Sequence, residues 1–142
     1  LMRIMAIDYG DAHTGIAISD PTGLLAGFTT VIDAWRPETA AERIAALAKE
    51  HGVERLVLGH PINMDGTRGP RSEKAQAMKS LLEAATGLPV VLWDERRTTI
   101  DAHQILQNSG KNARQRKKVV DAVAASLILE GYLTYWKSHP EE

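Results

Sequence analysis

The sequence predicts an α/β protein built on a mixed five-stranded sheet, with three antiparallel strands first, βα units after them, and helices on its faces. Three apolar segments near the N-terminus, at residues 3–9, 13–19 and 24–32, are separated only by short turns. Strands joined in this way pair antiparallel, because a parallel pair needs a long crossover connection. After residue 37, helical periodicity alternates with short apolar runs, which indicates helices packed on a sheet.

The opening segment, residues 3–9, is an apolar strand that carries one carboxylate. Side chains alternate between the two faces of a strand, so Asp8 is expected to point the same way as Ile4 and Ala6. Residues 20–23, Asp-Pro-Thr-Gly, have the composition of a turn between the second and third strands. An ionised carboxylate on a packed face needs compensation, although Asp8 could also simply cap the end of its strand.

The remaining elements follow from helical spacing, from glycines that end helices, and from short apolar runs. We expect a helix at 38–50 ended by Gly52, then a strand at 55–59 and a polar loop at 60–69. A second helix contains Met78, Leu81, Leu82 and Ala85 and is ended by Gly87, and a strand at 90–93 follows it. A third helix runs from a capping box at Thr98 and Asp101 to about Asn108, and a last helix occupies residues 115–136.

Composition limits the class of protein. A chain of 142 residues with 44% hydrophobic and 25% charged residues predicts one globular domain, residues 1–142. The absence of cysteine excludes disulfides and cysteine-ligated zinc, and the five histidines lack an HExxH spacing. Without a membrane-length apolar run or a signal-peptide pattern, we expect a cytoplasmic protein with no membrane partner.

Two further acids stand where chemistry is common. Glu95 directly follows a buried strand, at the sheet edge where α/β proteins bind ligands; it could instead pair with a neighbouring arginine. Asp121 shares a helix face with Ala125, Ile128 and Tyr132, so it needs a positive partner or a metal. Alternatively, the helix macrodipole could favour Asp121 if it lies near the start of its helix.

Taken together, Asp8, Glu95 and Asp121 predict a metal site. Three carboxylates from distant segments repel one another unless cations neutralise them, and hard oxygen ligands suit Mg²⁺ or Mn²⁺. A pair of such ions can activate water against a phosphodiester. We therefore expect these acids to be catalytic residues and metal ligands, with two ions as cofactor.

A basic segment precedes Asp121. Residues 102–120 contain no acid, but they carry five cations, Lys111, Arg114, Arg116, Lys117 and Lys118. Such a run is often only a solvated helix start. Cations at a helix N-terminus oppose the macrodipole, however, so a bound nucleic acid would explain their placement.

Several blocks in this sequence resemble one known family. They are Asp8-Tyr9-Gly10 with Gly15, residues 59–67 (GHPINMDGT), Asp94-Glu95-Arg96 with Thr98-Thr99, and Val120-Asp121-Ala122-Val123-Ala124-Ala125 with Ile128-Leu129. In this order they resemble the YqgF-type pre-16S rRNA nucleases, also called Holliday-junction-resolvase-like proteins, from residue 3 to about 135.

The resemblance implies an RNase H-like fold and a metal-dependent endonuclease that matures the 5′ end of 16S rRNA. By position, Asp8, Glu95 and Asp121 match the catalytic carboxylates of the family. Arg96 and the loop containing Asn63, Asp65 and Thr67 match its active-site surround, as substrate-binding residues. His13 and His60 depart from the usual pattern, and Asp65 and Asp94 are candidates for a fourth metal ligand.

Other functions stay open at this point. A Holliday junction resolvase would use the same chemistry on branched DNA but needs a two-fold dimer, for which the apolar Tyr132, Tyr135 and Trp136 are candidates; we expect a monomer or weak homodimer. Gly10 and Gly15 also resemble the first phosphate loop of actin-like ATPases, although 142 residues leave no room for a second such domain. A non-catalytic nucleic-acid-binding module is the last alternative.

Overall fold

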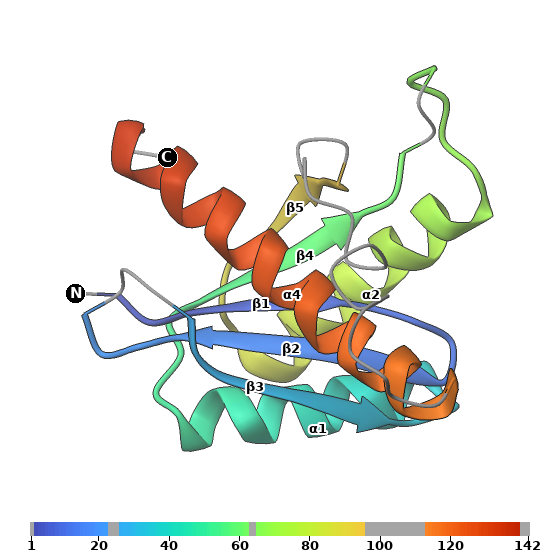
Figure 1. The fold of residues 1–142 in the computed structure, drawn as a ribbon, viewed down its shortest axis with the longest axis horizontal. Helices are drawn as coiled ribbons and strands as arrows, with labels where there is room; N and C mark the ends of the chain where they lie inside the picture. Colours follow the sequence, from blue (N-terminus) through green and yellow to red (C-terminus); the bar gives the residue numbers. More distant parts are fainter. Residues whose placement is uncertain (1, 23–25, 63–64, 96–112, 140–142) are drawn as a thin grey trace.

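The computed structural model describes residues 2–22, 26–62, 65–95 and 113–139, with side chains from residue 120 onward in the last helix. Its centre is a five-stranded sheet in the order β3-β2-β1-β4-β5 (Figure 1). The strands are β1 (Ile4–Asp8), β2 (His13–Ser19), β3 (Ala26–Asp33), β4 (Arg55–His60) and β5 (Val90–Asp94). The β1–β2 and β2–β3 pairs are antiparallel, whereas β1–β4 and β4–β5 are parallel. The predicted mixed sheet is confirmed.

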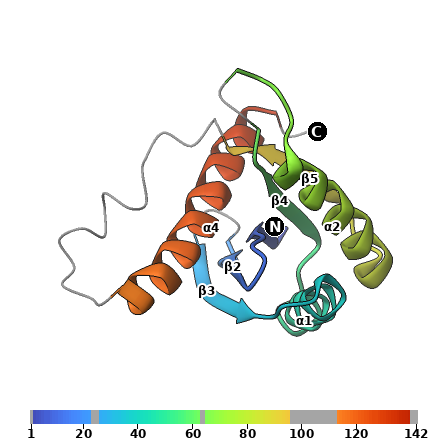
Figure 2. The same ribbon diagram turned by 90° about the vertical axis from the view of Figure 1, so that its right-hand side faces the viewer.

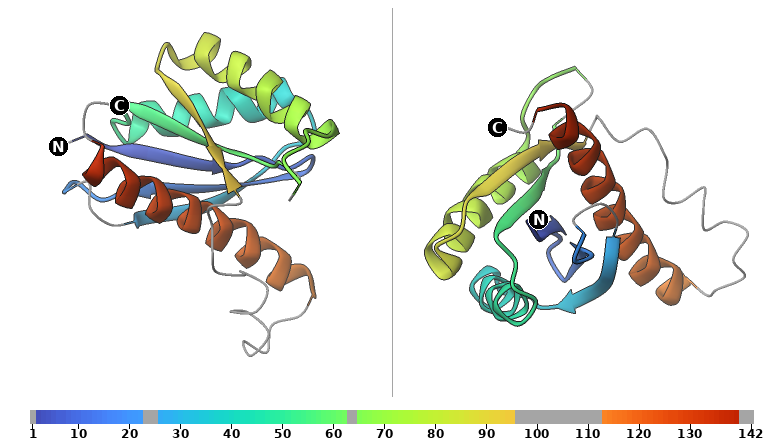
Figure 3. Two further views of the ribbon diagram at one scale, coloured as in Figure 1. Left: turned by 90° about the horizontal axis from the view of Figure 1, so that it is seen from above. Right: turned by 90° about the vertical axis from the view of Figure 1, so that its left-hand side faces the viewer.

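The helices cover both faces of this sheet. Helices α1 (Pro37–Glu50) and α2 (Pro70–Thr86) lie on one face, and α4 (Ala113–Ser138) crosses the other, as Figures 2 and 3 show. Both α1 and α2 begin at a proline, whose fixed φ suits the first turn. Helix α2 ends at Gly87, which adopts a left-handed conformation with φ of 69°. The predicted helix at 98–108 lies outside the described residues.

Strand β1 divides the core into two, because its side chains alternate. Met5 and Ile7 pack with α1 and α2, while Ile4 and Ala6 pack under α4. The alternation expected from the sequence is therefore confirmed. Asp8, the last residue of β1, continues the series of Ile4 and Ala6 and so lies on the α4 side.

The aromatic end of α4 is part of the second core. Tyr132 is buried, and its ring meets that of Trp93 edge to face at 5.8 Å. Tyr135 and Trp136 are partly buried against the same cluster. Much of the apolar surface that was a candidate dimer face is thus covered within the chain. Among the described helices, none combines the length and the apolar character needed to cross a membrane.

Candidate active site

The first acid, Asp8, stands at the end of the central strand, where the antiparallel half of the sheet meets the parallel half. Its residue partner on β2 is Gly15. Strand β1 is the middle strand of the sheet, and all of Ile4–Ile7 is buried. Asp8 therefore stands at the end of a strand that is paired on both sides, with β2 and with β4.

Helix α4 brings the second acid, Asp121, directly over β2. A Cβ atom at Gly15 would overlap the backbone carbonyl oxygen of Asp121, so the helix rests on bare backbone here. Alanines at 122, 124 and 125 keep the side chains in this part of the helix small. Because Gly15 is also the partner of Asp8, this one contact places Asp121 beside Asp8.

The depth of Asp121 in its helix bears on its role. Helix α4 begins at Ala113, so Asp121 lies more than two turns from the N-terminus. The macrodipole acts mainly within the first turn, so it does not account for a carboxylate at this position. The interpretation of Asp121 as a residue favoured by the helix start is wrong for this reason.

The third acid, Glu95, follows β5 immediately and reaches across β4. A Cβ atom at Gly59 would lie 2.5 Å from Oε1 of Glu95 and 2.8 Å from Cδ1 of Ile128. A second glycine thus leaves the space that a glutamate side chain and helix α4 occupy. Asp8, Asp121 and Glu95 are brought together by three segments that are far apart in the sequence.

The acids affect one another strongly. Burial raises the pKa of Asp8 from 3.8 to about 8, with further contributions from the charge of Glu95, a side-chain hydrogen bond with Glu95 and the charge of Asp121. The positive charge of Arg71 acts in the opposite direction. Without a cation at neutral pH, Asp8 therefore keeps a proton and shares a hydrogen bond with Glu95.

These carboxylates suit a hard divalent cation, which would replace the proton between them. In the part of the chain that the structure describes, no three histidine or acidic side chains form a preassembled metal site. The acids are close enough to interact electrostatically, but they are not closed around one point. Their oxygen chemistry and their mutual repulsion fit a divalent cation.

A pocket of about 130 Å³ opens beside Asp8 and Glu95. It is lined by Asp8, Tyr9, Gly10, Asp11, Gly59, Pro61, Arg71, Lys74, Ala75 and Glu95. The exposed cations Arg71 and Lys74 lie one turn apart near the start of α2. Sequence reasoning missed both residues. The available signal was two cations at the beginning of the helix that follows residues 59–67. An acidic floor with a basic wall can hold metal and phosphate side by side.

The predicted substrate-binding residues fall into two groups. Asp65 and Thr67 are exposed and hydrogen-bonded to each other: Oδ1 of Asp65 accepts hydrogen bonds from the amide (2.9 Å) and the hydroxyl (2.6 Å) of Thr67. Neither lines the pocket, and nor does Asp94. Asn63, Arg96 and Lys111 lie outside the described residues, as do the side chains of Arg114, Arg116, Lys117 and Lys118.

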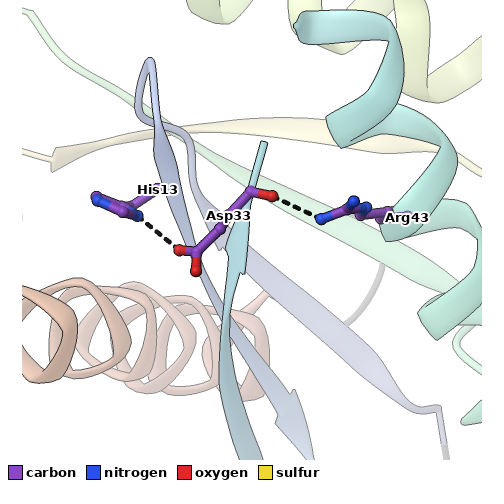
Figure 4. A network of polar contacts seen from close by, with 3 residues as sticks. All are labelled: His13, Asp33 and Arg43. Carbon is purple, nitrogen blue, oxygen red and sulfur yellow. Dashed lines mark hydrogen bonds and ion pairs between the residues drawn. The ribbon is translucent and has the colours of Figure 1, made fainter. Parts of the chain in front are cut away.

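The two unusual histidines have structural contacts. His13 Nδ1 lies 2.6 Å from Oδ1 of Asp33, and Arg43 donates to the Asp33 carbonyl (Figure 4). These contacts join the start of β2 to the end of β3 and to α1. His60 is buried at the end of β4, with Nε2 2.6 Å from Oγ of Ser72 on α2. Burial and Arg68 lower the pKa of His60. This pair fixes the start of α2, the helix that carries Arg71 and Lys74.

The mixed five-stranded sheet, with α1 and α2 on one face and α4 on the other, defines an RNase H-like fold. A solved structure titled as Thermus thermophilus RuvC in complex with Holliday junction substrate has the same fold, with a TM-score of 0.63 and 13% identity over 95% of this chain and 96% of that one. A Fowlpox virus resolvase, solved with Holliday junction DNA, gives a TM-score of 0.55 and 12% identity over 97% and 99%.

The chain belongs to the RuvX family, whose model, described as Holliday junction resolvase, matches residues 2–135. A Halothermothrix orenii protein is 44% identical over 134 residues, 94% of this chain and 96% of that protein. A Listeria monocytogenes relative is 46% identical, over 93% and 97%. Both relatives bear the name "Putative pre-16S rRNA nuclease".

Proposed function

We propose that this protein is a metal-dependent endonuclease that processes the 5′ end of precursor 16S rRNA in the cytoplasm, with residues 1–142 acting as one nuclease domain. The observation that carries the proposal is the meeting of Asp8, Glu95 and Asp121 at the end of β1, where burial and the two neighbouring acids raise the pKa of Asp8. Family membership and the names of the relatives supply the reaction class, hydrolysis of a phosphodiester bond.

In this proposal, Asp8, Glu95 and Asp121 would hold Mg²⁺ or Mn²⁺, with Asp8 between the other two acids. Two bound cations would supply an activated water and stabilisation of the leaving oxygen. Arg71 and Lys74 line the same pocket and attract the phosphate that the acids would otherwise repel. Ionised Asp8 is needed for this arrangement, because a protonated carboxyl holds a cation poorly.

The flanking backbone would be held by more distant groups. Lys111, Arg114, Arg116, Lys117 and Lys118 are the proposed phosphate contacts. Arg96, Asn63, Asp65 and Thr67 are proposed as further substrate-binding residues around the active site. If these cations meet phosphates, binding should weaken steeply as salt rises. The family and the proposed phosphate contacts both favour a nucleic acid as the partner. The alternative, a nucleotide-binding ATPase domain, has no support from the family.

The decisive experiment compares cleavage of precursor rRNA and of a four-way DNA junction with Mg²⁺, Mn²⁺ or chelator. Asp8→Asn should lower cleavage by orders of magnitude while folding and RNA binding survive. Glu130→Gln makes the same chemical change at an exposed position of α4 and should leave cleavage unchanged. Full cleavage by Asp8→Asn, or in chelator, would contradict the proposal.

The resolvase alternative is separated by the same assay and by mass. Two symmetric cuts require two active sites in a two-fold dimer. Paired cleavage of the junction by a protein that elutes as a stable dimer, without cleavage of the rRNA precursor, would favour a resolvase. RNA binding that needs no metal and leads to no cleavage would favour a non-catalytic binding module.

A further inference from the structure

Trp35 is an exposed aromatic residue beside the candidate active site. It follows β3 and precedes α1, and 81% of its surface is open to solvent. Among the described residues, the only other exposed large hydrophobic side chain is Phe28, at 37%. A tryptophan open to this degree offers aromatic surface for contact with a ligand.

A groove of about 310 Å³ runs along Trp35. It is lined by Tyr9, Asp11, Trp35, Pro37, Lys74, Ala77, Met78 and Leu81. Tyr9, Asp11 and Lys74 also line the acidic pocket, so the two hollows lie next to each other. The groove is mainly apolar, and a cation stands where it joins the place proposed for the reacting phosphate.

Lys74 is available at this junction. Its ammonium lies 2.8 Å from Oδ1 of Asp11, but both side chains are more than half exposed, at 54% and 72%. Such surface ion pairs contribute little stability, so a phosphate can replace Asp11 at low cost. The same lysine can therefore serve the pocket and the groove.

We propose that this groove binds a nucleobase of the substrate, next to the phosphate that is cut, by stacking the base on Trp35 with Tyr9 as a second aromatic wall. The proposal rests on the proposed nuclease function. Aromatic surface beside a cation is the composition of single-strand binding sites, where bases stack and phosphates are neutralised. A paired base inside a helix presents no free face, so the strand is single where it meets Trp35.

The test uses Asp8→Asn as background, so that an RNA oligonucleotide spanning the cleavage site stays intact with Mg²⁺. Trp35→Ala should weaken binding roughly 5- to 150-fold, the range that base stacking on an aromatic side chain supplies. Trp35→Phe keeps an aromatic face and should recover most of the loss. Phe28→Ala is the matched control, because Phe28 lies at the other end of β3, and it should have no effect.

An abasic position, moved one nucleotide at a time along the oligonucleotide, locates the stacked base. At one position near the cut, the abasic site and Trp35→Ala should each weaken binding, and together no more than either alone, because both remove the same contact. At all other positions the two losses should add.

The failures are distinguishable. Suppose that the wild type cuts the RNA, and that Trp35→Ala binds and cuts it as well as Phe28→Ala does. The stacking proposal is then overturned, while the proposed nuclease function is retained. The groove would in that case serve another partner, such as a protein. If the losses from Trp35→Ala and from the abasic site add at every position, the stacking proposal is likewise overturned. If no nucleic acid is bound or cut by any variant, the proposed function fails, and the stacking proposal fails with it.

Discussion

Replacing Asp8 by asparagine should make the metal-free protein more stable, although it removes the central acid of the site. Asparagine resembles protonated aspartic acid in shape but cannot ionise beside Glu95 and Asp121. A pKa raised from 3.8 to about 8 corresponds to at most about 5–6 kcal/mol, at about 1.4 kcal/mol per unit. Relaxation and water entry reduce such values for buried acids, so we expect about 2–3 kcal/mol at pH 8 or above.

The stability that Asp8→Asn gains over the wild type should increase with pH. Between pH 3.8 and about 8, folded Asp8 holds a proton that the unfolded chain has already released. The stability linked to this proton is fully present below pH 3.8 and is lost as pH rises through about 8. Asp8→Asn escapes this loss, so its advantage over the wild type should grow from weakly acid to alkaline pH and then level off.

Thermal unfolding in chelator, at several pH values from 5 to 9, measures this difference directly. For a chain of this size, about 2–3 kcal/mol corresponds to a rise in Tm of roughly 5–10 °C. Contributions present in both proteins, such as that of His60, largely cancel in the difference. Glu130→Gln, at an exposed site, should follow the wild type at every pH.

Adding metal should reverse the order of stability. A cation at 1,000 times its Kd stabilises the folded wild type by about 4.1 kcal/mol, which exceeds the expected advantage of Asp8→Asn, and Asp8→Asn should itself gain far less. An Asp8→Asn advantage that does not change with pH, or an equal gain of both proteins from Mn²⁺, would refute the account of three interacting acids.

Three other substitutions test separate contacts. Gly15→Ala places a methyl group on the backbone of α4, so it should cost about 1–3 kcal/mol in chemical denaturation and lower cleavage with it. Arg71→Ala removes the charge that opposes the raised pKa of Asp8, so the acid limb of the pH–rate profile should move to higher pH and Arg71→Lys should restore it. Ser72→Ala deprives buried His60 of a hydrogen-bond partner and should cost about 1–3 kcal/mol of stability, measured by urea unfolding. A Ser72→Ala protein as stable as the wild type would show that this contact makes no net contribution to the free energy of unfolding.

The sheet and the burial of its strands could be predicted from the sequence because short apolar runs and turn residues determine them locally. The period of two in residues 4–8 was enough to place Asp8 on the face with Ile4 and Ala6, as the two cores confirm. The period of the last helix likewise placed Asp121 with Ala125 and Ile128. Periodicity therefore indicated which faces the acids occupy.

What the sequence could not supply is the angle at which distant elements meet. Arg71 and Lys74 face the acids only because α2 packs where it does, and nothing local signals that packing. The loop matched by resemblance predicted Asp65 and Thr67 at the substrate, yet both are exposed and hydrogen-bonded to each other outside the pocket. Their predicted role in binding remains a prediction.

The two positions where a Cβ would collide, 15 and 59, act as spacers between layers. At each of them the absence of a Cβ atom allows a neighbouring segment to come close. The distances between the acids therefore depend on these positions having no side chain. A related protein could retain every carboxylate and still be inert if either position acquired a side chain. Surveys of such proteins for activity should therefore weigh these two glycines as heavily as the acids themselves.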